Sequence, residues 1–363
     1  MLWRYRVPSL NELKRGPWLF GLRADLMAFG GSAMVAAVLV LYGATTQLLE
    51  RELSLLFWLV LIVGIDVAHV WATAYRVYLD PDELRSRRLL YLGMPLVLYF
   101  INLILYAISP SLFWRCLAYA AVFHFVRQQL GWVLLYRRKA GESASVDAAL
   151  DRTAIYAATV YPLLHWHAHL PRNFYWFVEG DFVTGVRLDW VDALEPLYWA
   201  VLAIFVLRQL HLFLRGVLNP GKILVVSTTW FCWWLGIIAL DSDYAFTVTN
   251  VVIHGVPYMV LNYTYARQRA RQNPSSAGSV LTSRGWFIFL LSLVFCALLE
   301  ETLWDRWVYH DRPAFFGTGS VFSGQIVALL APALALPQTL HYFLDGVIWR
   351  TRRRTAKKHV AFI

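Results

Sequence analysis

Continuous apolar runs recur along the whole 363-residue chain, each about as long as the 20 residues that a helix needs to cross a bilayer. Because the bilayer core offers no hydrogen-bond partners, such runs fold as helices, whereas a membrane β-barrel would show alternating polar and apolar residues. Only 15% of the residues are charged, against about 25% in a soluble domain. The sequence therefore predicts an all-α, polytopic transmembrane helical bundle.

Ten of these runs are predicted to span the membrane. Their approximate ranges are 26–44, 53–75, 89–108, 111–136, 153–170, 191–214, 221–240, 244–266, 285–303 and 322–349. The chain then divides into an interfacial N-terminal segment 1–25, a transmembrane domain 26–349 and a basic tail 350–363. The three cysteines lie inside apolar runs and predict no disulfide framework.

The distribution of charge predicts an orientation in the membrane. The formal net charge is +10, and its basic residues gather in alternate loops, such as 85–88 and 137–139, and in the tail. The intervening loops are short or acidic, so the positive-inside rule places both termini in the cytosol. We expect a multi-pass protein of a bacterial-type inner membrane, and the confinement of the charge to loops argues against nucleic-acid binding.

Four histidines lie inside predicted spans, where ionisable residues are costly and mark functional sites. They are His69, His124, His254 and His341, on the second, fourth, eighth and tenth spans, and the predicted topology places them at overlapping depth near the cytosolic side. Each has a polar neighbour three or four positions away on the same helix face, and these neighbours are Asp66, Gln128, Asn250 and Asp345.

These residue types are typical of a transition-metal site. Neutral imidazoles suit iron, copper or zinc, and adjoining carboxylates favour iron or manganese. We expect iron, as one or two ions, held by the four histidines, while the four polar neighbours act as further ligands, as hydrogen-bond partners of the ligands or as catalytic groups. The simpler alternative for any single histidine is a hydrogen bond to a neighbouring helix.

Two other groups of polar residues are candidates on the external side. The sequence HWHAH at the end of the fifth span places His165 and His169 one turn apart, which predicts either a second metal or proton site or an interfacial anchor. Glu300 and Glu301 lie at the external end of the ninth span, and we expect them to face water.

Two arginines near the predicted centre are candidates for binding a substrate head group. Arg76 and Arg127 carry charge toward the cytosolic ends of the second and fourth spans. They are expected either to bind that head group, to pair with Asp66 and Asp345, or to extend toward lipid phosphate.

Several familiar catalytic motifs are absent from the sequence: it has no P-loop, dinucleotide fingerprint, GxSxG or HExxH motif. The HxxHH boxes of membrane desaturases and hydroxylases are absent as well. Single histidines on separate spans, here His69, His124, His254 and His341, instead resemble the Brp/Blh family of membrane carotenoid-cleaving dioxygenases. The resemblance is architectural, and it implies one non-haem iron at which oxygen cleaves a polyene at its central double bond.

The sequence thus predicts an integral-membrane metalloenzyme, an iron-dependent oxidoreductase or oxygenase acting on a membrane lipid or isoprenoid. One alternative is a proton- or ion-coupled transporter that uses the same buried residues as a relay, with helices broken at Pro257 and Pro337. Another is a lipid transferase in which His254, beside Asn250, is the general base.

Overall fold

The computed structural model describes residues 9–50, 53–171, 176–240, 242–274 and 276–349, so the basic tail 350–363 and the first eight residues lie outside the described part. Within these ranges helices are the only regular secondary structure, which confirms the predicted all-α class.

The described chain forms seventeen α-helices, several of which continue into π-helical segments. In chain order the α-helices are α1 (Leu10–Lys14), α2 (Leu22–Asp25), α3 (Ser32–Thr45), α4 (Leu55–Phe57), α5 (Ala68–Arg76), α6 (Pro81–Ser86), α7 (Arg88–Ile108), α8 (Pro110–Lys139), α9 (Ser145–Ala168), α10 (Leu188–Leu214), α11 (Pro220–Trp233), α12 (Asp243–Gln272), α13 (Ala277–Ser283), α14 (Trp286–Trp304), α15 (Pro313–Phe316), α16 (Gly324–Leu334) and α17 (Leu336–Ile348). The π-helical segments are η1 (Leu26–Gly31), η3 (Trp58–Val67), η4 (Trp234–Ala239) and η5 (Asp305–Tyr309), and η2 (Leu48–Glu50) is a 3₁₀-helix.

Eight helical runs in the described ranges are long and apolar enough to cross a membrane. They are Leu22–Thr45, Leu55–Arg76, Arg88–Ile108, Leu188–Leu214, Pro220–Ala239, Asp243–Gln272, Trp286–Tyr309 and Gly324–Ile348. The helices α8 and α9 occupy the two remaining predicted spans and are also long, but they are not among these eight. The membrane character of the chain is therefore supported, and the count of ten spans stays a prediction.

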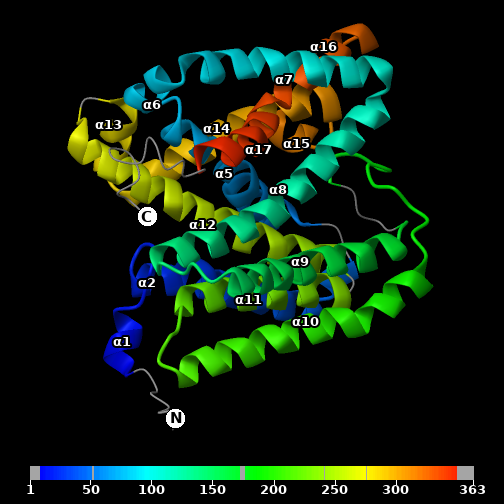
Figure 1. The fold of residues 1–363 in the computed structure, drawn as a ribbon. Helices are drawn as coiled ribbons and strands as arrows, with labels where there is room; N and C mark the ends of the chain where they lie inside the picture. Colours follow the sequence, from blue (N-terminus) through cyan, green and yellow to red (C-terminus); the bar gives the residue numbers. More distant parts are fainter. Residues whose placement is uncertain (1–8, 51–52, 172–175, 241, 275, 350–363) are drawn as a thin grey trace, which may run out of the picture.

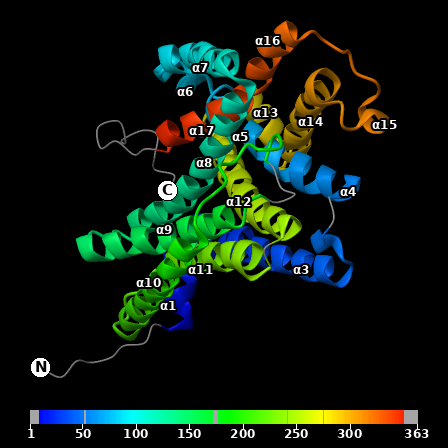
Figure 2. The same cartoon turned by 90° about the vertical axis from the view of Figure 1, so that its right-hand side faces the viewer.

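Helix α12 forms the middle of the bundle. In Figures 1 and 2 it lies with α8 between two groups of helices, one containing α5, α7, α14 and α17, the other α3, α9, α10 and α11. Most residues of α12 are buried on all sides. An added Cβ at Gly255 would lie 2.6 Å from the Ile65 side chain, so glycine permits the close approach of α12 and η3 beside His254.

Side-chain caps define where the long central helices begin. The side chains of Ser109, Asn219 and Ser242 accept hydrogen bonds from first-turn amides of α8, α11 and α12 respectively. Pro110 and Pro220 follow directly as the first residues of α8 and α11, where the missing amide hydrogen costs nothing. These local signals fix the start of the helices that carry His124 and His254.

Two predicted spans depart from regular helices. The predicted span 53–75 contains the π-helix η3, in which backbone hydrogen bonds join residues five apart instead of four. This wider turn ends just before His69. The predicted span 322–349 is divided at Ala335, because Pro337 has no amide hydrogen to continue the helical ladder to Ala333. Pro257, in contrast, lies inside an unbroken α12, so the expected break there is wrong.

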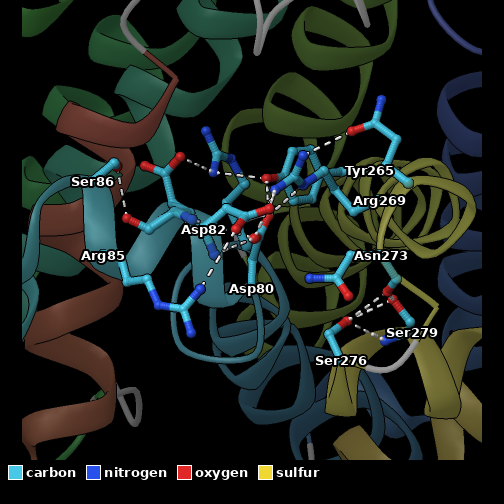
Figure 3. A network of polar contacts seen from close by, with 12 residues as sticks. Asp80, Asp82, Arg85, Ser86, Tyr265, Arg269, Asn273, Ser276 and Ser279 are labelled. Carbon is cyan, nitrogen blue, oxygen red and sulfur yellow. Dashed lines mark hydrogen bonds and ion pairs between the residues drawn. The ribbon is translucent and has the colours of Figure 1, made fainter.

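A network of polar contacts joins the loop after α5 to the end of α12 (Figure 3). The Asp80 carboxylate accepts hydrogen bonds from Arg269 at 2.7 and 2.9 Å and from the Tyr265 hydroxyl at 2.6 Å. The same carboxylate caps α6 by accepting from the amides of Asp82 and Glu83. One buried carboxylate therefore holds three segments of the fold together.

This network predicts an acid-sensitive contribution to stability. Burial alone would raise the pKa of the Asp80 carboxyl, but the hydrogen bonds and charge of Arg269, with the Tyr265 hydroxyl, outweigh burial and leave the pKa below its ordinary value. A carboxyl with a lowered folded-state pKa stabilises the fold above its unfolded pKa of about 3.9, and this stabilisation is lost as the pH falls through the folded value.

We therefore expect Asp80→Asn to lower the stability in detergent by about 1.5–3 kcal/mol at pH 7, the usual contribution of hydrogen bonds to a charged group. The difference between variant and wild type should shrink as the pH falls below about 4, as followed by thermal unfolding at a series of pH values. Glu179→Gln, which alters an exposed carboxylate, is the control that should keep the wild-type profile. A constant difference at every pH would contradict the role given to the Asp80 charge.

Candidate metal centre

The structure brings together the four histidines that the sequence singled out. His69 on α5, His124 on α8, His254 on α12 and His341 on α17 each offer one ring nitrogen, and these atoms all lie within 4.8 Å of one another. None of the four residues is more than 4% exposed. The Nε2 atoms of His69 and His254 are 3.0 Å apart.

The 3.0 Å separation of His69 Nε2 and His254 Nε2 fits the coordination shell of a single ion. Two nitrogens that each lie about 2.1 Å from one ion are roughly 3.0 Å apart at a right angle and roughly 3.4 Å apart in a tetrahedron. The ring nitrogens His124 Nε2 and His341 Nε2 are buried with no hydrogen-bond partner in the described part of the chain. Buried polar atoms without partners are costly, and a bound cation would satisfy them.

The ring orientations are fixed by neighbouring groups. His69 Nδ1 lies 3.3 Å from the Ile65 carbonyl oxygen, which can only accept, so the ring donates there and keeps the lone pair on Nε2. The His254 ring stacks on Phe125 with centroids 3.6 Å apart, and the His124 ring stacks on Tyr342 at 5.0 Å. The two aromatic rings cover the imidazole faces and limit their rotation.

The four predicted polar neighbours occupy different positions around this centre. Asp345 lies beside it, with Oδ2 3.9 Å from His124 Nε2, and Asp66 Oδ1 lies 3.9 Å from His69 Nδ1. The Gln128 side chain donates at 2.8 Å to the main-chain carbonyl of His254. The Asn250 amide donates to the carbonyl of Phe246 on its own helix at 3.0 Å.

Two hydroxyl groups beside the centre were missed from the sequence. The Thr73 hydroxyl lies 2.8 Å from His341 Nδ1 and 2.9 Å from the hydroxyl of Tyr258. Thr73 and Tyr258 each stand four residues after a histidine of the centre, as do Gln128 and Asp345. The signal that would have found them is this common spacing, which creates a second polar layer about 6 Å along the helices from the histidines.

The expectation that Glu300 faces water is wrong. Glu300 is 4% exposed, and its carboxylate accepts a hydrogen bond from Trp71 Nε1 at 2.7 Å and another from the amide of Gln338. The residue lies inside because α14 packs against α5 and places this face of the helix toward the bundle. Glu300 therefore links α5 and α17, the helices that carry His69 and His341, while Glu301 is half-buried.

The two arginine candidates are engaged elsewhere. Arg76 is buried and forms an ion pair with Glu83 at 3.0 Å and a hydrogen bond with Tyr265 at 3.1 Å. Arg127 is exposed and donates to the hydroxyl of Tyr156 at 2.8 Å. Among the described residues neither arginine forms the alternative ion pairs with the aspartates beside the centre, and their binding of a head group stays a prediction.

The HWHAH cluster forms a separate arrangement of rings. The centroids of His165 and His169 are 4.3 Å apart, and His169 Nδ1 lies 2.7 Å from the main-chain oxygen of His165. His167 contacts the Tyr119 hydroxyl at 2.8 Å. Within the described ranges, the group of His69, His124, His254 and His341 alone brings three or more potential metal ligands together.

Comparison with known proteins gives no assignment, since no protein-family model, no curated protein and no solved structure matches this chain. The resemblance to the Brp/Blh family accordingly stays a prediction. What the site can do follows from its own residues, which offer four imidazole donors in a buried setting with a carboxylate about 4 Å away.

Proposed function

We propose that this chain is an integral-membrane metalloenzyme in which His69, His124, His254 and His341 hold one iron ion, and that it oxidises a membrane lipid or isoprenoid. The observation that carries the proposal is the convergence of four buried imidazoles from four helices, with donor atoms within 4.8 Å.

The surroundings of the histidines suit oxidative chemistry on an apolar substrate. A bound iron would supply the activation of oxygen. The chain supplies the rest: Phe125 and Tyr342 cover the imidazole rings and exclude water, and the Asp345 carboxylate offers an acceptor for a proton at Oδ2. Buried positions among membrane-spanning helices favour a substrate that arrives from the bilayer.

The proposed topology has ten spans, both termini in the cytosol and the centre nearer the cytosolic side of a bacterial-type inner membrane. Its support is the alternation of basic loops along the sequence together with α8 and α9, which are long enough to complete the ten spans.

The direct experiment is elemental analysis of protein purified in detergent without chelators. We expect iron at an approximately stoichiometric ratio, lost on prolonged dialysis against a strong chelator and restored by anaerobic Fe(II). Manganese, copper or zinc at the same ratio would change the identity of the proposed ion but would still support the proposed metal site. Protein that is folded and carries no metal, even after exposure to each of these ions, would overturn the proposal.

One observation favours a transporter as a second candidate. The helix break at Ala335 lies a single turn before Gln338 and two turns before His341, and broken helices beside buried polar residues are typical of transporters. Proton or cation flux into liposomes that continues after metal removal would select this candidate. The Asn250 amide bonds to its own helix, so no observation favours the transferase with His254 as base.

A further inference from the structure

Four side chains from three helices form one continuous hydrogen-bonded chain that ends at the histidine centre. His341 Nδ1 lies 2.8 Å from Thr73 Oγ1, which lies 2.9 Å from the Tyr258 hydroxyl, which in turn lies 2.5 Å from Asp345 Oδ1. Thr73, Tyr258 and His341 are at most 4% exposed. Water therefore cannot replace these partners without a change in the packing.

The direction of the hydrogen bonds follows from the group at the end of the chain. An ionised carboxylate can only accept, so the Tyr258 hydroxyl donates to Asp345. The Tyr258 oxygen then accepts from the Thr73 hydroxyl, and the Thr73 oxygen accepts from His341 Nδ1. This order places the only ring proton of neutral His341 on Nδ1 and leaves the lone pair on Nε2, an atom without another partner in the described chain.

The two hydroxyls are needed because the carboxylate does not reach the ring itself. Asp345 Oδ1 is 3.9 Å from His341 Nδ1, which is too long for a hydrogen bond. A metal-ligating histidine commonly donates its second ring N–H to a carboxylate or carbonyl, which fixes the tautomer and raises the basicity of the ligand. In this chain Thr73 and Tyr258 bridge the gap.

We propose that Thr73 and Tyr258 are positioning residues that transmit the negative charge of Asp345 to His341 and hold its Nε2 as a metal donor. This inference rests on the proposed metal centre. Thr73, Tyr258 and Asp345 together form the relay. The relay acts on the affinity of the site for metal, and neither hydroxyl contacts the ion.

The test measures metal affinity in the full-length protein with Co(II), whose visible absorption reports binding to nitrogen ligands. Metal-free protein is titrated with Co(II) against a competing chelator. Thr73→Val and Tyr258→Phe each remove one hydroxyl with little change in volume, and we expect each to weaken binding about 10–100-fold. Tyr75→Phe is the matched control. Tyr75 lies on α5, as Thr73 does, and its hydroxyl bonds Ser292 and takes no part in the relay.

Two further variants separate a relay from a merely structural role. Thr73→Ser keeps the hydroxyl, so it should bind Co(II) as tightly as the wild type. The double variant Thr73→Val, Tyr258→Phe should bind no more weakly than the worse single variant, because either change interrupts the same chain. Additive losses, or single variants that match Tyr75→Phe, would overturn the relay.

The outcome also distinguishes this inference from the proposed function. If the wild type binds neither Co(II) nor iron, the metal centre fails and the relay fails with it. If the wild type binds metal and the hydroxyl variants bind equally well, the relay alone is wrong. If Tyr258→Phe fails to fold, the Co(II) affinities of Thr73→Val and Thr73→Ser still test the relay.

Discussion

His124→Ala and His341→Ala are each expected to reduce bound metal from an approximately stoichiometric ratio to background. Each variant removes one of four donors that lie within 4.8 Å, and the remaining three cannot surround the ion on the vacated side. The loss should exceed the 10–100-fold weakening expected when only a hydrogen-bond partner of a ligand is removed. Elemental analysis of the purified variants, with Co(II) titration of the metal-free proteins, measures the effect.

The matched control is His211→Ala, which removes an exposed histidine on α10 and should leave the metal content unchanged. Size-exclusion profiles and helical circular dichroism must agree with the wild type, so that loss of metal is not loss of fold. Retention of metal by folded His124→Ala and His341→Ala would show that these residues are not ligands.

The largest loss of stability is expected from Lys222→Met. Lys222 is 1% exposed at the start of α11, and its ammonium group contacts Glu142 at 2.8 Å and Asp151 at 3.0 Å. Arg137 on α8 forms ion pairs with the same two carboxylates. Without Lys222 the two carboxylates share the single charge of Arg137, so one buried negative charge is left uncompensated, and breaking a buried ion pair in this way costs about 3–5 kcal/mol.

Thermal unfolding in detergent, followed by tryptophan fluorescence, measures this loss. Arg208→Met provides the comparison, because the Arg208–Asp147 pair also joins helices but lies partly in solvent. Its loss should cost about 0–1 kcal/mol, since water screens an exposed pair. Equal midpoints for Lys222→Met and Arg208→Met would contradict the importance of burial in the α8, α9 and α11 network.

Much of the helical architecture could be predicted from hydropathy. A run of about 20 apolar residues has few alternatives to a helix, and most predicted spans match observed helices closely, as 89–108 matches α7. The convergence of the four histidines also followed from the sequence, because polar groups in apolar helices must face one another. Their assignment as metal ligands is still a proposal.

The burial of Glu300 and the hydroxyl groups beside the centre depend on packing between helices, which hydropathy does not encode. Glu300 lies in the last turns of the apolar helix α14, where an exposed residue would also fit, and only the approach of Trp71 and Gln338 shows that it is buried. The sequence predicts the polar partners of His69 and His254, Asp66 and Asn250, on the turn before each histidine. Thr73 and Tyr258 lie on the turn after, and neither residue type stands out within a span.

The four histidines also set an order of events during biosynthesis. Helices α5, α8 and α12 leave the ribosome before α17, the last helix of the described chain, so His69, His124 and His254 wait for His341. Until α17 arrives, the hydroxyls of Thr73 and Tyr258 also lack their final partners. If the proposed metal centre forms, its loading would be a late step of maturation, and a chain that stalled before α17 would lack one of the four proposed ligands.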